Sequence, residues 1–562
     1  DYLPNIRALD DVNQLEAFED ALPEEVFNRL LEIALDLVDR PQVSDDKLSQ
    51  SLNRHQGGED LYQFVDSDEF KRALNGSMAE WMLFLAPFQR DLARRRIKGP
   101  ARIRGVAGSG KTVVAIHRAY HLARQIVHNQ PDSKVLFLTY GNRLPGIVNY
   151  LLEQLAGPQA PELNVIECVT IHQWCRSFLK DEERLLEIAD NQKRLLSEAI
   201  DRVRPYYTDL ALWQRPVDFF KDEIQYAIKG RAIRTLDAYL QLDRSGRGTA
   251  LRQRERHAIF QVYQTYQQAL ADQGRCDFDD WILTALDMLE QGVRPKCHYV
   301  SAVVDEIQDL SEAVIRLIRQ VVEPGPNDLF LVGDGLQRLY PGGYSLSKLG
   351  IDVVGRSALL KRNYRNTQEI LRAAHAMVRN HNFNDLEDTI SSAPEPVYSA
   401  RSGPVPTLHR FDTPEAEIGW ICAEIKRLKQ TQNYANGDFV LLYRWRDPYQ
   451  KLIVDLLSGV IELQELTRDA SVYFGPAAKH TTFDSSKGLE FKVVFVVGVT
   501  DGSLVPKDDW TLNGAELEDY LTREKQRLYV AMTRARDLLY LTCSRGQPSR
   551  FLDDVPEMYL KR

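Results

Sequence analysis

The residues with the clearest chemistry lie in the stretch ARIRGVAGSGKTVVAIHR, between Gly105 and Thr112. Gly105, Gly110, Lys111 and Thr112 match the pattern G-x-x-x-x-G-K-[ST], in which small residues let the backbone close around a polyphosphate. Lys111 would hold the β- and γ-phosphates, and Thr112 would offer its hydroxyl to Mg²⁺. A plain Gly-Ser-Gly turn is the alternative. The strand before the loop and the apolar helix that begins near Val113 favour a nucleotide site, since a helix N-terminus attracts anions. The backbone N–H groups of the same loop would face the phosphates at Ala107, Gly108 and Ser109.

A second group of polar residues follows buried strands further along the chain. Asp305 and Glu306 end the apolar strand SAVV, where Asp305 can hold Mg²⁺ and Glu306 can polarise the water that attacks the γ-phosphate. Gln337 follows another buried strand and would sense the γ-phosphate. An acidic doublet is also common on surfaces, but its place after a buried strand favours a phosphate-loop partner.

Three further positions could complete a nucleotide site. The amide of Gln89 could pair with the edge of adenine, and Tyr364 and Arg365 could stack on the base and touch the γ-phosphate. Arg534 follows a helix in the last third of the chain. It could be solvated, but an arginine delivered from a second sheet would couple hydrolysis to domain closure.

Polar and aromatic residues at strand ends indicate a nucleic-acid site. Tyr140, Asn142 and Arg143 follow one apolar strand, and Thr170 and His172 follow the next. Such residues suit contact with sugar-phosphate and bases, although buried histidine is at least as common.

Length, composition and charge limit the classes of protein to which the chain can belong. The 562 residues, 44% apolar and 27% charged, predict several domains of a globular α/β protein with buried parallel strands. No run approaches the roughly 18 apolar residues of a membrane span, and the six cysteines lack metal spacing, so we expect a cytoplasmic protein without membrane contact. Asp1 in place of Met suggests that the natural N-terminus is missing. The net charge of −9 allows a local basic groove but argues against a surface coated in nucleic acid.

Taken together, VAGSGKT, VVDEIQD, LVGDGLQRLY, NYRN, SSKGLEF and YVAMTRAR resemble the motifs of UvrD/Rep/PcrA-like helicases of superfamily 1, in that family's order. The resemblance implies two RecA-like P-loop domains with parallel sheets, a helical insertion in the first and a helical N-terminal extension. The expected boundaries are 1–84 for the extension, 85–182 and 276–352 for the first domain, 183–275 for the insertion and 353–562 for the second domain.

The resemblance also implies roles for single residues. Arg118 and Glu490 would join the nucleotide site, Glu490 through the ribose, and Arg365 and Arg534 would be the two arginine fingers. Tyr140, Asn142, Arg143, Thr170 and His172 would contact the strand. ATP and Mg²⁺ would be the cofactors.

Three features depart from the family pattern. After Gln337 the segment RLYPGGY keeps Tyr340 but lacks the usual bulky ring and arginine, and Tyr344 is the candidate replacement. Asp484 stands where the family generally has histidine, although Lys487 remains as a strand contact. The short separation between Arg365 and Thr481 predicts that the accessory insertion of the second domain is absent or reduced.

We therefore expect an ATP hydrolase and 3′→5′ DNA helicase or translocase that acts on single-stranded or partial duplex DNA, with RNA not excluded. The alternative is an ATP-switched nucleic-acid-binding or remodelling module without processive unwinding. Residues 1–84 also resemble a segment that follows a RelE/ParE-like toxin domain in a bacterial subgroup, which implies a linked toxin domain or a protein partner there.

Overall fold

The computed structural model of the chain describes residues 70, 72–73, 76–130, 132–242, 251–334, 344–378, 382–384, 390–392, 397–399, 401–505, 514–544, 546 and 548–562. Gln337, Tyr340 and most of the 1–84 extension lie outside these residues, so the expectations for them stay predictions. The chain divides into two compact units, residues 1–95 and 96–562, which are described separately.

The described part of the first unit is helical. Helix α5 (Met78–Met82) begins with a capping box in which Ser77 and Glu80 exchange side-chain and backbone hydrogen bonds. Helix α6 is Pro87–Arg94. Phe70, Trp81 and Phe84 pack with ring centroids 5.5 to 6.5 Å apart. These aromatic contacts give the described part of this unit a small apolar core.

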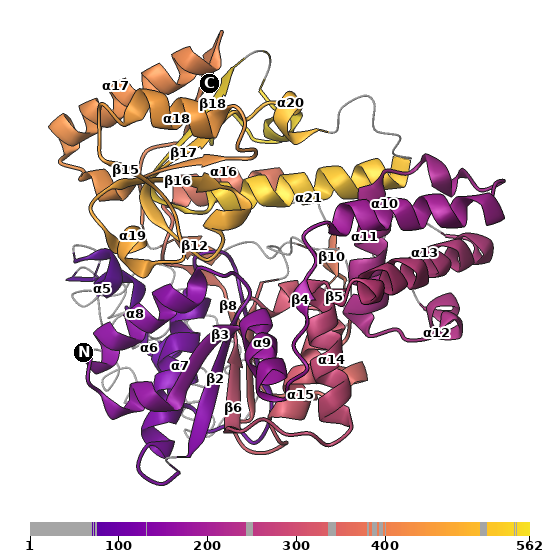
Figure 1. Ribbon diagram of the computed structural model, residues 1–562. Coiled ribbons are helices and arrows are strands. Elements are labelled where there is room, and N and C mark those ends of the chain that lie inside the picture. The colour runs from indigo at the N-terminus through magenta and orange to yellow at the C-terminus, as the bar shows by residue number, and fades with distance from the viewer. Residues whose placement is uncertain are drawn as a thin grey trace, which may run out of the picture. The chain divides into compact units, whose positions relative to one another are not determined.

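The larger unit contains a first parallel sheet that carries the phosphate loop (Figure 1). Its strand order is β3-β2-β6-β7-β1-β8, with Ile103 opposite Val332 and Val303 opposite Phe330 in register. Its strands are mostly apolar, as expected for a sheet that is covered on both faces, although β1 contains Arg102 and Arg104. They are β1 (Ala101–Gly105), β2 (Ser133–Thr139), β3 (Ile166–Thr170), β6 (His298–Val304), β7 (Leu329–Gly333) and β8 (Ser357–Leu360).

Helices of the same domain bury their apolar faces against this sheet and against one another. Trp174 and Phe178 of α9, Leu286 of α14 and Ile318 of α15 share one buried core with the strands. The helices of this domain are α7 (Lys111–Ile126), α8 (Leu144–Ala156), α9 (Ile171–Asp181), α14 (Phe278–Glu290) and α15 (Glu312–Val321). Strand β8 pairs with β1, so the first domain extends past residue 352, where the sequence predicted its end.

A helical insertion separates β3 from β6. The short strands β4 (Glu187–Ile188) and β5 (Arg275–Cys276) pair at its base. Between them lie α10 (Gln192–Val203), α11 (Val217–Asp222), a π-helical turn (Glu223–Ile228), α12 (Leu236–Gln241) and α13 (Gln253–Asp272). The insertion has its own apolar core, built around Phe220, Tyr239 and Phe260. The sequence prediction for this insertion is residues 183–275.

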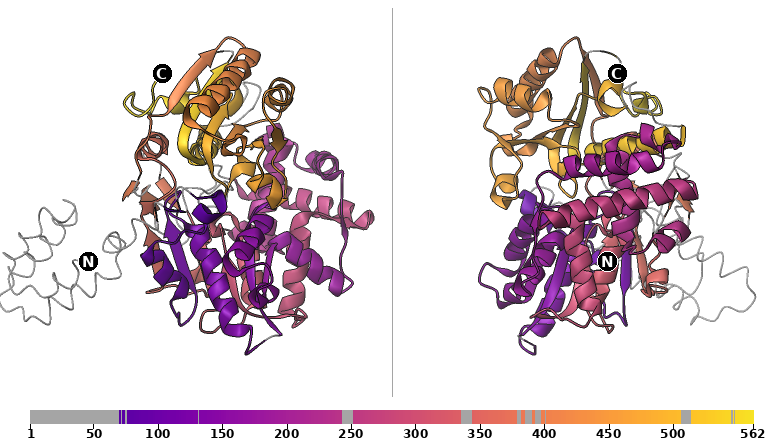
Figure 2. Two further views of the ribbon diagram at one scale, coloured as in Figure 1. Left: turned by 90° about the vertical axis from the view of Figure 1, so that its left-hand side faces the viewer. Right: turned by 45° about the vertical axis from the view of Figure 1, so that its right-hand side comes forward.

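A second, wholly parallel sheet follows, with strand order β13-β18-β17-β14-β16-β15. Figure 2 shows the first sheet in indigo to magenta and the second in orange to yellow. The strands are β13 (Thr407–Phe411), β14 (Phe439–Tyr443), β15 (Leu463–Glu465), β16 (Ala478–Thr482), β17 (Phe491–Val497) and β18 (Ala535–Ser544).

The second sheet has its own helices and core. Ile421 and Ile425 of α17 and Ile453 of α18 pack against Phe439 and Phe495 of the sheet. The helices are α16 (Gln368–Val378), α17 (Pro414–Gln432), α18 (Tyr449–Leu457), α19 (Ala470–Phe474), α20 (Asp501–Leu504) and α21 (Gly514–Met532). The described residues between Arg365 and Thr481 otherwise form only short segments, including β10 (Asn382–Asn384), β11 (Ile390–Ser392) and β12 (Val397–Ser399), and no separate helical subdomain.

Contacts join the two sheets and the insertion within the larger unit. Tyr150 of α8 stacks on Phe474 of α19 with centroids 4.4 Å apart. Helix α21 runs toward α11 (Figure 1), where Arg523 lies 3.5 Å from Asp222. None of the helices in the described ranges combines the length and the apolar character that a membrane span requires.

Candidate active site and nucleic-acid interface

The phosphate loop leaves the carboxyl end of β1 and leads directly into α7. Gly108 and Gly110 have φ values of 72° and 77°, a conformation that side chains rarely adopt. A Cβ at Gly108 would lie 2.6 Å from Asn363 Nδ2, so only glycine allows this close approach. Lys111 donates to the carbonyls of Gly105 and Val106 at 2.8 and 2.9 Å. Its ammonium is therefore held over the loop that would receive the phosphates.

A hydroxyl and a carboxylate meet beside this loop. Thr112 Oγ1 donates to Asp305 Oδ2 at 2.8 Å, and Asp305 Oδ1 accepts from the backbone N–H of Glu306 at 3.0 Å. Burial, together with the neighbouring Glu306 charge, raises the pKa of Asp305 to about 7. Hard oxygen donors of this kind suit Mg²⁺, which usually takes one or two protein ligands and completes its shell with phosphates and water. Correspondingly, no group of three or more metal-ligating side chains occurs in the described residues.

Glu306 is held in a strained and highly charged position. Its backbone has φ 55° and ψ 40°, in the left-handed region, which for a residue other than glycine is uncommon and typical of functional sites. Gln308 donates from Nε2 to Glu306 and accepts from the backbone N–H of Asp334 at 2.9 Å. Burial raises the pKa of Glu306, but Lys487 and Lys111 outweigh it and lower the pKa overall. Glu306 is thus kept as a carboxylate.

Lys487, a predicted strand contact, lies against acidic residues of the first domain. Its ammonium is buried, pairs with Asp309 and lies 3.8 Å from Glu306 Oε2. Its contact with nucleic acid stays a prediction. The lysine follows β16 of the second sheet, so it faces the acidic motif of the first sheet across the domain boundary.

The segment from Asn363 to Asn366 connects the phosphate loop to the second sheet. Asn363 Nδ2 donates to the carbonyl of Ala107 at 2.6 Å, and the N–H of Tyr364 donates to the carbonyl of Gly108 at 3.0 Å. Asn366 Nδ2 donates to the carbonyls of Thr533 and Ala535 at 3.0 and 2.5 Å. Tyr364 is half-buried beside the guanidinium of Arg362, 5.7 Å from the ring centroid.

Of the two predicted arginine fingers, Arg365 lies beside the loop, where its backbone N–H donates to the carbonyl of Gly108 at 3.3 Å, and the charge of Arg534 acts on Glu306. Arg365 forms an ion pair with Glu490, the predicted ribose contact. Each of these two candidate residues therefore has the other as its partner. Arg534 is 1% exposed and donates to the carbonyls of Val530 and Leu489 at 2.8 and 3.1 Å. Burial, and then the charge of Arg365, lowers the pKa of Arg534 to about 9. Their roles toward a nucleotide stay predictions.

Two further residues, Gln89 and Arg118, are predicted nucleotide contacts. Gln89 belongs to the first unit, where its Oε1 accepts from the backbone N–H of Ala86 at 2.8 Å, and its adenine contact stays a prediction. Arg118 lies two turns along α7 and donates to Asn327, which precedes β7, at 2.8 Å. Its guanidinium lies 5.2 Å from the ring centroid of Phe330. It therefore points toward the opposite ends of the strands from the loop, and its predicted nucleotide contact stays a prediction.

Three of the predicted nucleic-acid residues line one cavity of about 80 Å³, which we call the strand pocket. Tyr140 and His172 enter it from the ends of β2 and β3, and Tyr344 donates from its hydroxyl to the carbonyl of Ile307 at 3.0 Å. Burial lowers the pKa of His172, partly offset by the charge of Asp277. Neutral imidazole and phenol rings of this kind suit stacking with bases.

The insertion supplies strand-pocket residues that the sequence reasoning missed. Gln225, Tyr226, Gly230 and Arg231 line the pocket, the first two from the π-helical turn. Such turns occur often at functional sites. The sequence offered no signal for Tyr226, because it lies in a helical stretch without a recognisable motif.

The other predicted strand contacts have different surroundings. Thr170 is 1% exposed and caps α9, since its hydroxyl accepts from the N–H of Gln173 at 3.3 Å. Its hydroxyl is therefore buried and already accepts a hydrogen bond, and the strand contact of Thr170 stays a prediction. Arg143 donates across the domain boundary to Thr481 Oγ1 and to the carbonyl of Ser485 at 3.2 and 3.1 Å. Asn142 is exposed, and its strand contact stays a prediction.

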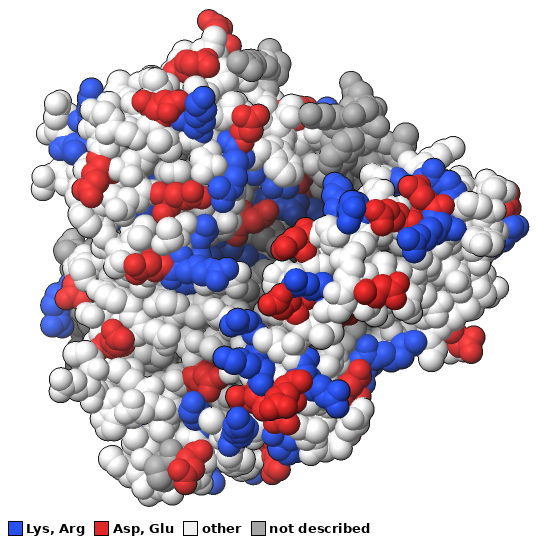
Figure 3. Space-filling view, viewed as in Figure 1, with Lys and Arg blue, Asp and Glu red and all other residues white. Residues whose placement is uncertain are grey.

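Asp484, which departs from the family pattern, is held in an ionic network. Its carboxylate accepts from Arg527 Nε at 3.0 Å and lies 3.5 Å from Arg444 Nη1. Both arginines also bind Glu524. Figure 3 shows Lys and Arg side chains, with Asp and Glu among them, along the hollow that crosses this face of the molecule. A strand in such a hollow would meet alternating charges and not a uniformly basic surface.

Two family models match consecutive parts of the chain. The model described as the UvrD/REP helicase N-terminal domain matches residues 85–341. The model described as the UvrD-like helicase C-terminal domain matches residues 358–465 and 460–546.

Curated relatives match across the same region. A probable DNA helicase II homolog from Mycoplasma capricolum is 23% identical over 492 residues, which are 82% of this chain and 63% of the relative. The ATP-dependent DNA helicase PcrA from Leuconostoc citreum is 26% identical over 362 residues, which are 62% of this chain and 45% of the relative. A probable DNA helicase from Mycoplasma pneumoniae is 25% identical over 488 residues, which are 81% of this chain and 84% of the relative. The chain thus spans less than two thirds of the length of the first two relatives.

Proposed function

We propose the function of this chain from one premise: it belongs to the UvrD-like helicases of superfamily 1. The chain hydrolyses ATP between its two sheets and uses the resulting domain movement to translocate on single-stranded DNA. Relatives described as ATP-dependent DNA helicases support the choice of ATP and DNA. The resemblance stated above supports movement in the 3′→5′ direction.

One observation supports the coupling of hydrolysis to strand movement. A single short segment, residues 305–312, serves both sites. Asp305 and Glu306 lie beside the phosphate loop, while the following residues, Gln308 to Glu312, line the strand pocket. Gln308 belongs to both, because it binds Glu306 and lines the pocket. A change in one site therefore has a direct structural route to the other.

The residues present fit the hydrolytic chemistry. Lys111 would exchange its loop carbonyls for the β- and γ-phosphates, and Glu306 would orient and deprotonate the attacking water. Thr112 and Asp305 would hold Mg²⁺, which supplies charge neutralisation on the phosphate oxygens. Arg365 would leave Glu490 to meet the γ-phosphate together with Arg534, and Glu490 would then be free to accept from the ribose.

A second function is favoured by the altered residue at 484. Asp484 is negative and held by Arg444 and Arg527, so it offers no cation to a strand phosphate. If the second domain binds the strand phosphates less tightly near Asp484, closure of the two domains on ATP would hold nucleic acid without processive movement. This is the behaviour of a switch or remodelling module.

The ATPase measurement tests the shared part of both functions. Lys111→Ala is expected to abolish DNA-stimulated ATP hydrolysis, while Lys180→Ala, an exposed lysine at the end of α9, keeps the wild-type rate. Equal rates in the wild type and Lys111→Ala would overturn the proposal.

Streptavidin displacement from biotinylated single strands separates the two functions. A 3′→5′ motor removes streptavidin from the 5′ end only. Active hydrolysis without displacement from either end identifies the switch.

A further inference from the structure

Helix α19 of the second domain ends in two consecutive aromatic residues that contact different parts of the molecule. Phe474 stacks on Tyr150 of α8 in the first domain, with ring centroids 4.4 Å apart. Tyr473 is 5% exposed and faces the second domain, where its ring packs edge-to-face on Phe491 at 5.5 Å. The rings of Tyr473 and Phe474 lie 4.7 Å apart. A displacement of Phe474 therefore also displaces Tyr473, because close-packed side chains transmit strain.

The hydroxyl of Tyr473 binds both backbone polar groups of Glu490. It donates to the carbonyl of Glu490 at 2.8 Å and accepts from the N–H of the same residue at 3.3 Å. Glu490 directly precedes β17, so a side chain of α19 fixes the peptide from which this strand starts. Burial, and then the charge of Glu490, raises the pKa of the Tyr473 hydroxyl, which therefore stays neutral and able to donate.

These hydrogen bonds do not involve the carboxylate of Glu490. In this structure the carboxylate pairs with Arg365, and in the proposed function it exchanges this partner for the ribose. Because Tyr473 binds only the backbone of Glu490, its hydrogen bonds can persist through the exchange. A side chain that recognises a ligand needs such supporting contacts, since a small misplacement removes the hydrogen bond.

Helix α8 of the first domain approaches α19 closely at two positions on one face. A Cβ at Gly146 would lie 2.7 Å from the carbonyl oxygen of Arg468, which precedes α19, so glycine permits this approach. Tyr150 lies four residues further along the same face of α8 and supplies the stack on Phe474. The position of α19 therefore depends on where the first domain lies.

We propose that α19 links the approach of the two domains to recognition of the nucleotide ribose, with Tyr473 as the positioning residue for Glu490. The inference rests on the proposed function and concerns specificity for the sugar. When the domains meet, the stack of Tyr150 on Phe474 places α19, and the Tyr473 hydroxyl places Glu490 so that its carboxylate accepts from a ribose hydroxyl. A nucleotide that lacks this hydroxyl leaves the carboxylate unpaired and binds less tightly.

Steady-state kinetics with ATP, 2′-deoxy-ATP and 3′-deoxy-ATP test the proposal at saturating single-stranded DNA. The wild type is expected to have a lower KM for ATP than for the analogue that lacks the bound hydroxyl. Tyr473→Phe keeps the ring contacts and loses the hydrogen bonds to Glu490. Its KM for ATP should rise about five-fold, while its kcat and its KM for that analogue change by less than about two-fold, as expected when a binding contact is lost.

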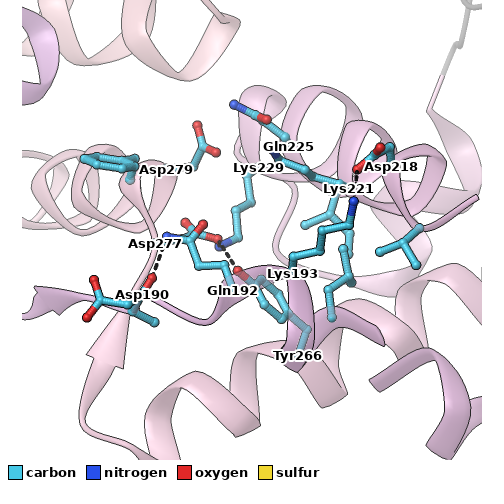
Figure 4. A pocket seen from close by; sticks show the side chains of 15 residues that line it. Asp190, Gln192, Lys193, Asp218, Lys221, Gln225, Lys229, Tyr266, Asp277 and Asp279 are labelled. Atoms are coloured by element: carbon cyan, nitrogen blue, oxygen red, sulfur yellow. Dashed lines mark hydrogen bonds and ion pairs between the residues drawn. The ribbon is translucent and has the colours of Figure 1, made fainter. Parts of the chain in front are cut away.

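Tyr266→Phe is the matched control. Tyr266 is also 5% exposed, and its hydroxyl donates to Asp277 at 3.3 Å beside a cavity of about 340 Å³ in the insertion (Figure 4). This variant loses a buried hydroxyl that does not contact Glu490, so it should keep the wild-type ratio of the KM values. Thermal unfolding of both variants separates a general loss of stability from a loss of sugar specificity.

Tyr150→Ala tests the link to the first domain. It removes the stack on Phe474 and should reduce the ratio of the KM values in the same direction as Tyr473→Phe. The double variant should lose no more specificity than Tyr473→Phe alone, whereas losses that multiply would overturn the link through α19. Asn149→Ala, an exposed neighbour on α8, should keep the wild-type ratio.

The outcomes separate this inference from the proposed function. A wild type without DNA-stimulated ATP hydrolysis overturns both. A wild type that hydrolyses ATP and both deoxy analogues with equal KM values overturns this inference and leaves the motor intact. A Tyr473→Phe variant that keeps the wild-type ratio of the KM values has the same meaning.

Discussion

Lys487 Nζ lies 3.8 Å from Glu306 Oε2 and pairs with Asp309, so a lysine of the second domain contacts the acidic motif of the first. The ammonium lowers the pKa of Glu306 against the effect of burial. The predicted catalytic carboxylate is therefore held in its charged form by a residue that moves with the other domain. Separation of the domains would withdraw this cation.

Replacement of Lys487 should lower the rate of ATP turnover. Lys487→Ala is expected to lower kcat for ATP hydrolysis at least ten-fold at saturating DNA, because Glu306 loses its facing cation. Lys492→Ala, which removes a lysine paired with Asp438 at 2.8 Å, is the control. If Lys487 instead binds the strand, the DNA concentration for half-maximal stimulation rises and kcat is unchanged.

The pair between Arg365 and Glu490 gives a second prediction. Arg365→Ala should lower kcat by roughly three decades or more, as expected for an arginine finger, while the affinity for a non-hydrolysable ATP analogue changes only a few-fold. Arg372→Ala on the exposed face of α16 controls for loss of charge. A variant with kcat within two-fold of the wild type would remove Arg365 from the catalytic group.

Thr170 and Tyr226 should behave in opposite ways. Thr170→Ala loses the cap of α9 and should cost about 1 kcal/mol of stability, with little change in oligonucleotide affinity. Tyr226→Ala should weaken oligonucleotide binding roughly ten-fold through a lost stacking contact. Thermal unfolding and anisotropy titrations on both variants check this, and equal binding losses would contradict the assignment of Thr170 as a cap.

Burial of Lys479 should make the free energy of unfolding depend on pH. It is buried in β16 and donates to the carbonyls of Gly437 and Gly475 at 3.1 and 2.7 Å. Burial lowers its pKa to about 8 from 10.5. The folded state thus binds this proton less tightly than the unfolded state, so the contribution of Lys479 to stability rises from about pH 8 to about pH 10.5 and is lost as the pH falls through 8.

The measurement compares apparent unfolding midpoints of the wild type and Lys479→Met between pH 7 and pH 10. We expect the wild-type midpoint to rise relative to the variant as the pH increases. Lys451→Met, an exposed lysine on α18, should show a constant difference. A pH-independent difference for Lys479→Met would show that its proton is bound equally in both states.

Local patterns predicted most of the fold. Apolar runs placed the buried strands, and the glycine pattern placed the turn at Gly108 and Gly110, because both depend on residues close in sequence. The hydrogen bond between Thr112 and Asp305 agrees with their predicted shared role, since both residues follow the carboxyl ends of strands in one parallel sheet, β1 and β6, with only β7 between them. Strand β8 lies beyond residue 352, the predicted end of the first domain, and joins the first sheet by a pairing that its own sequence does not reveal.

The directions in which individual side chains point do not follow from the motifs. Lys487 and Arg143 both look like strand contacts from their motifs, yet each is turned to a partner in the other domain. Arg118 follows the loop closely in sequence, but two helical turns carry its guanidinium toward Asn327. Distances of this kind depend on packing between distant segments, which a motif does not encode.

The π-helical turn Glu223–Ile228 determines which side chains of the insertion face its own core and which face the strand pocket. Ile224 and Ala227 face the apolar core of the insertion, while the half-buried Gln225 and Tyr226 line the strand pocket. One residue corresponds to about 100° of rotation around a helix. Deletion of one residue here would rotate the residues before the turn by this angle relative to those after it, so the length of the turn decides which side chains of the insertion face the strand pocket.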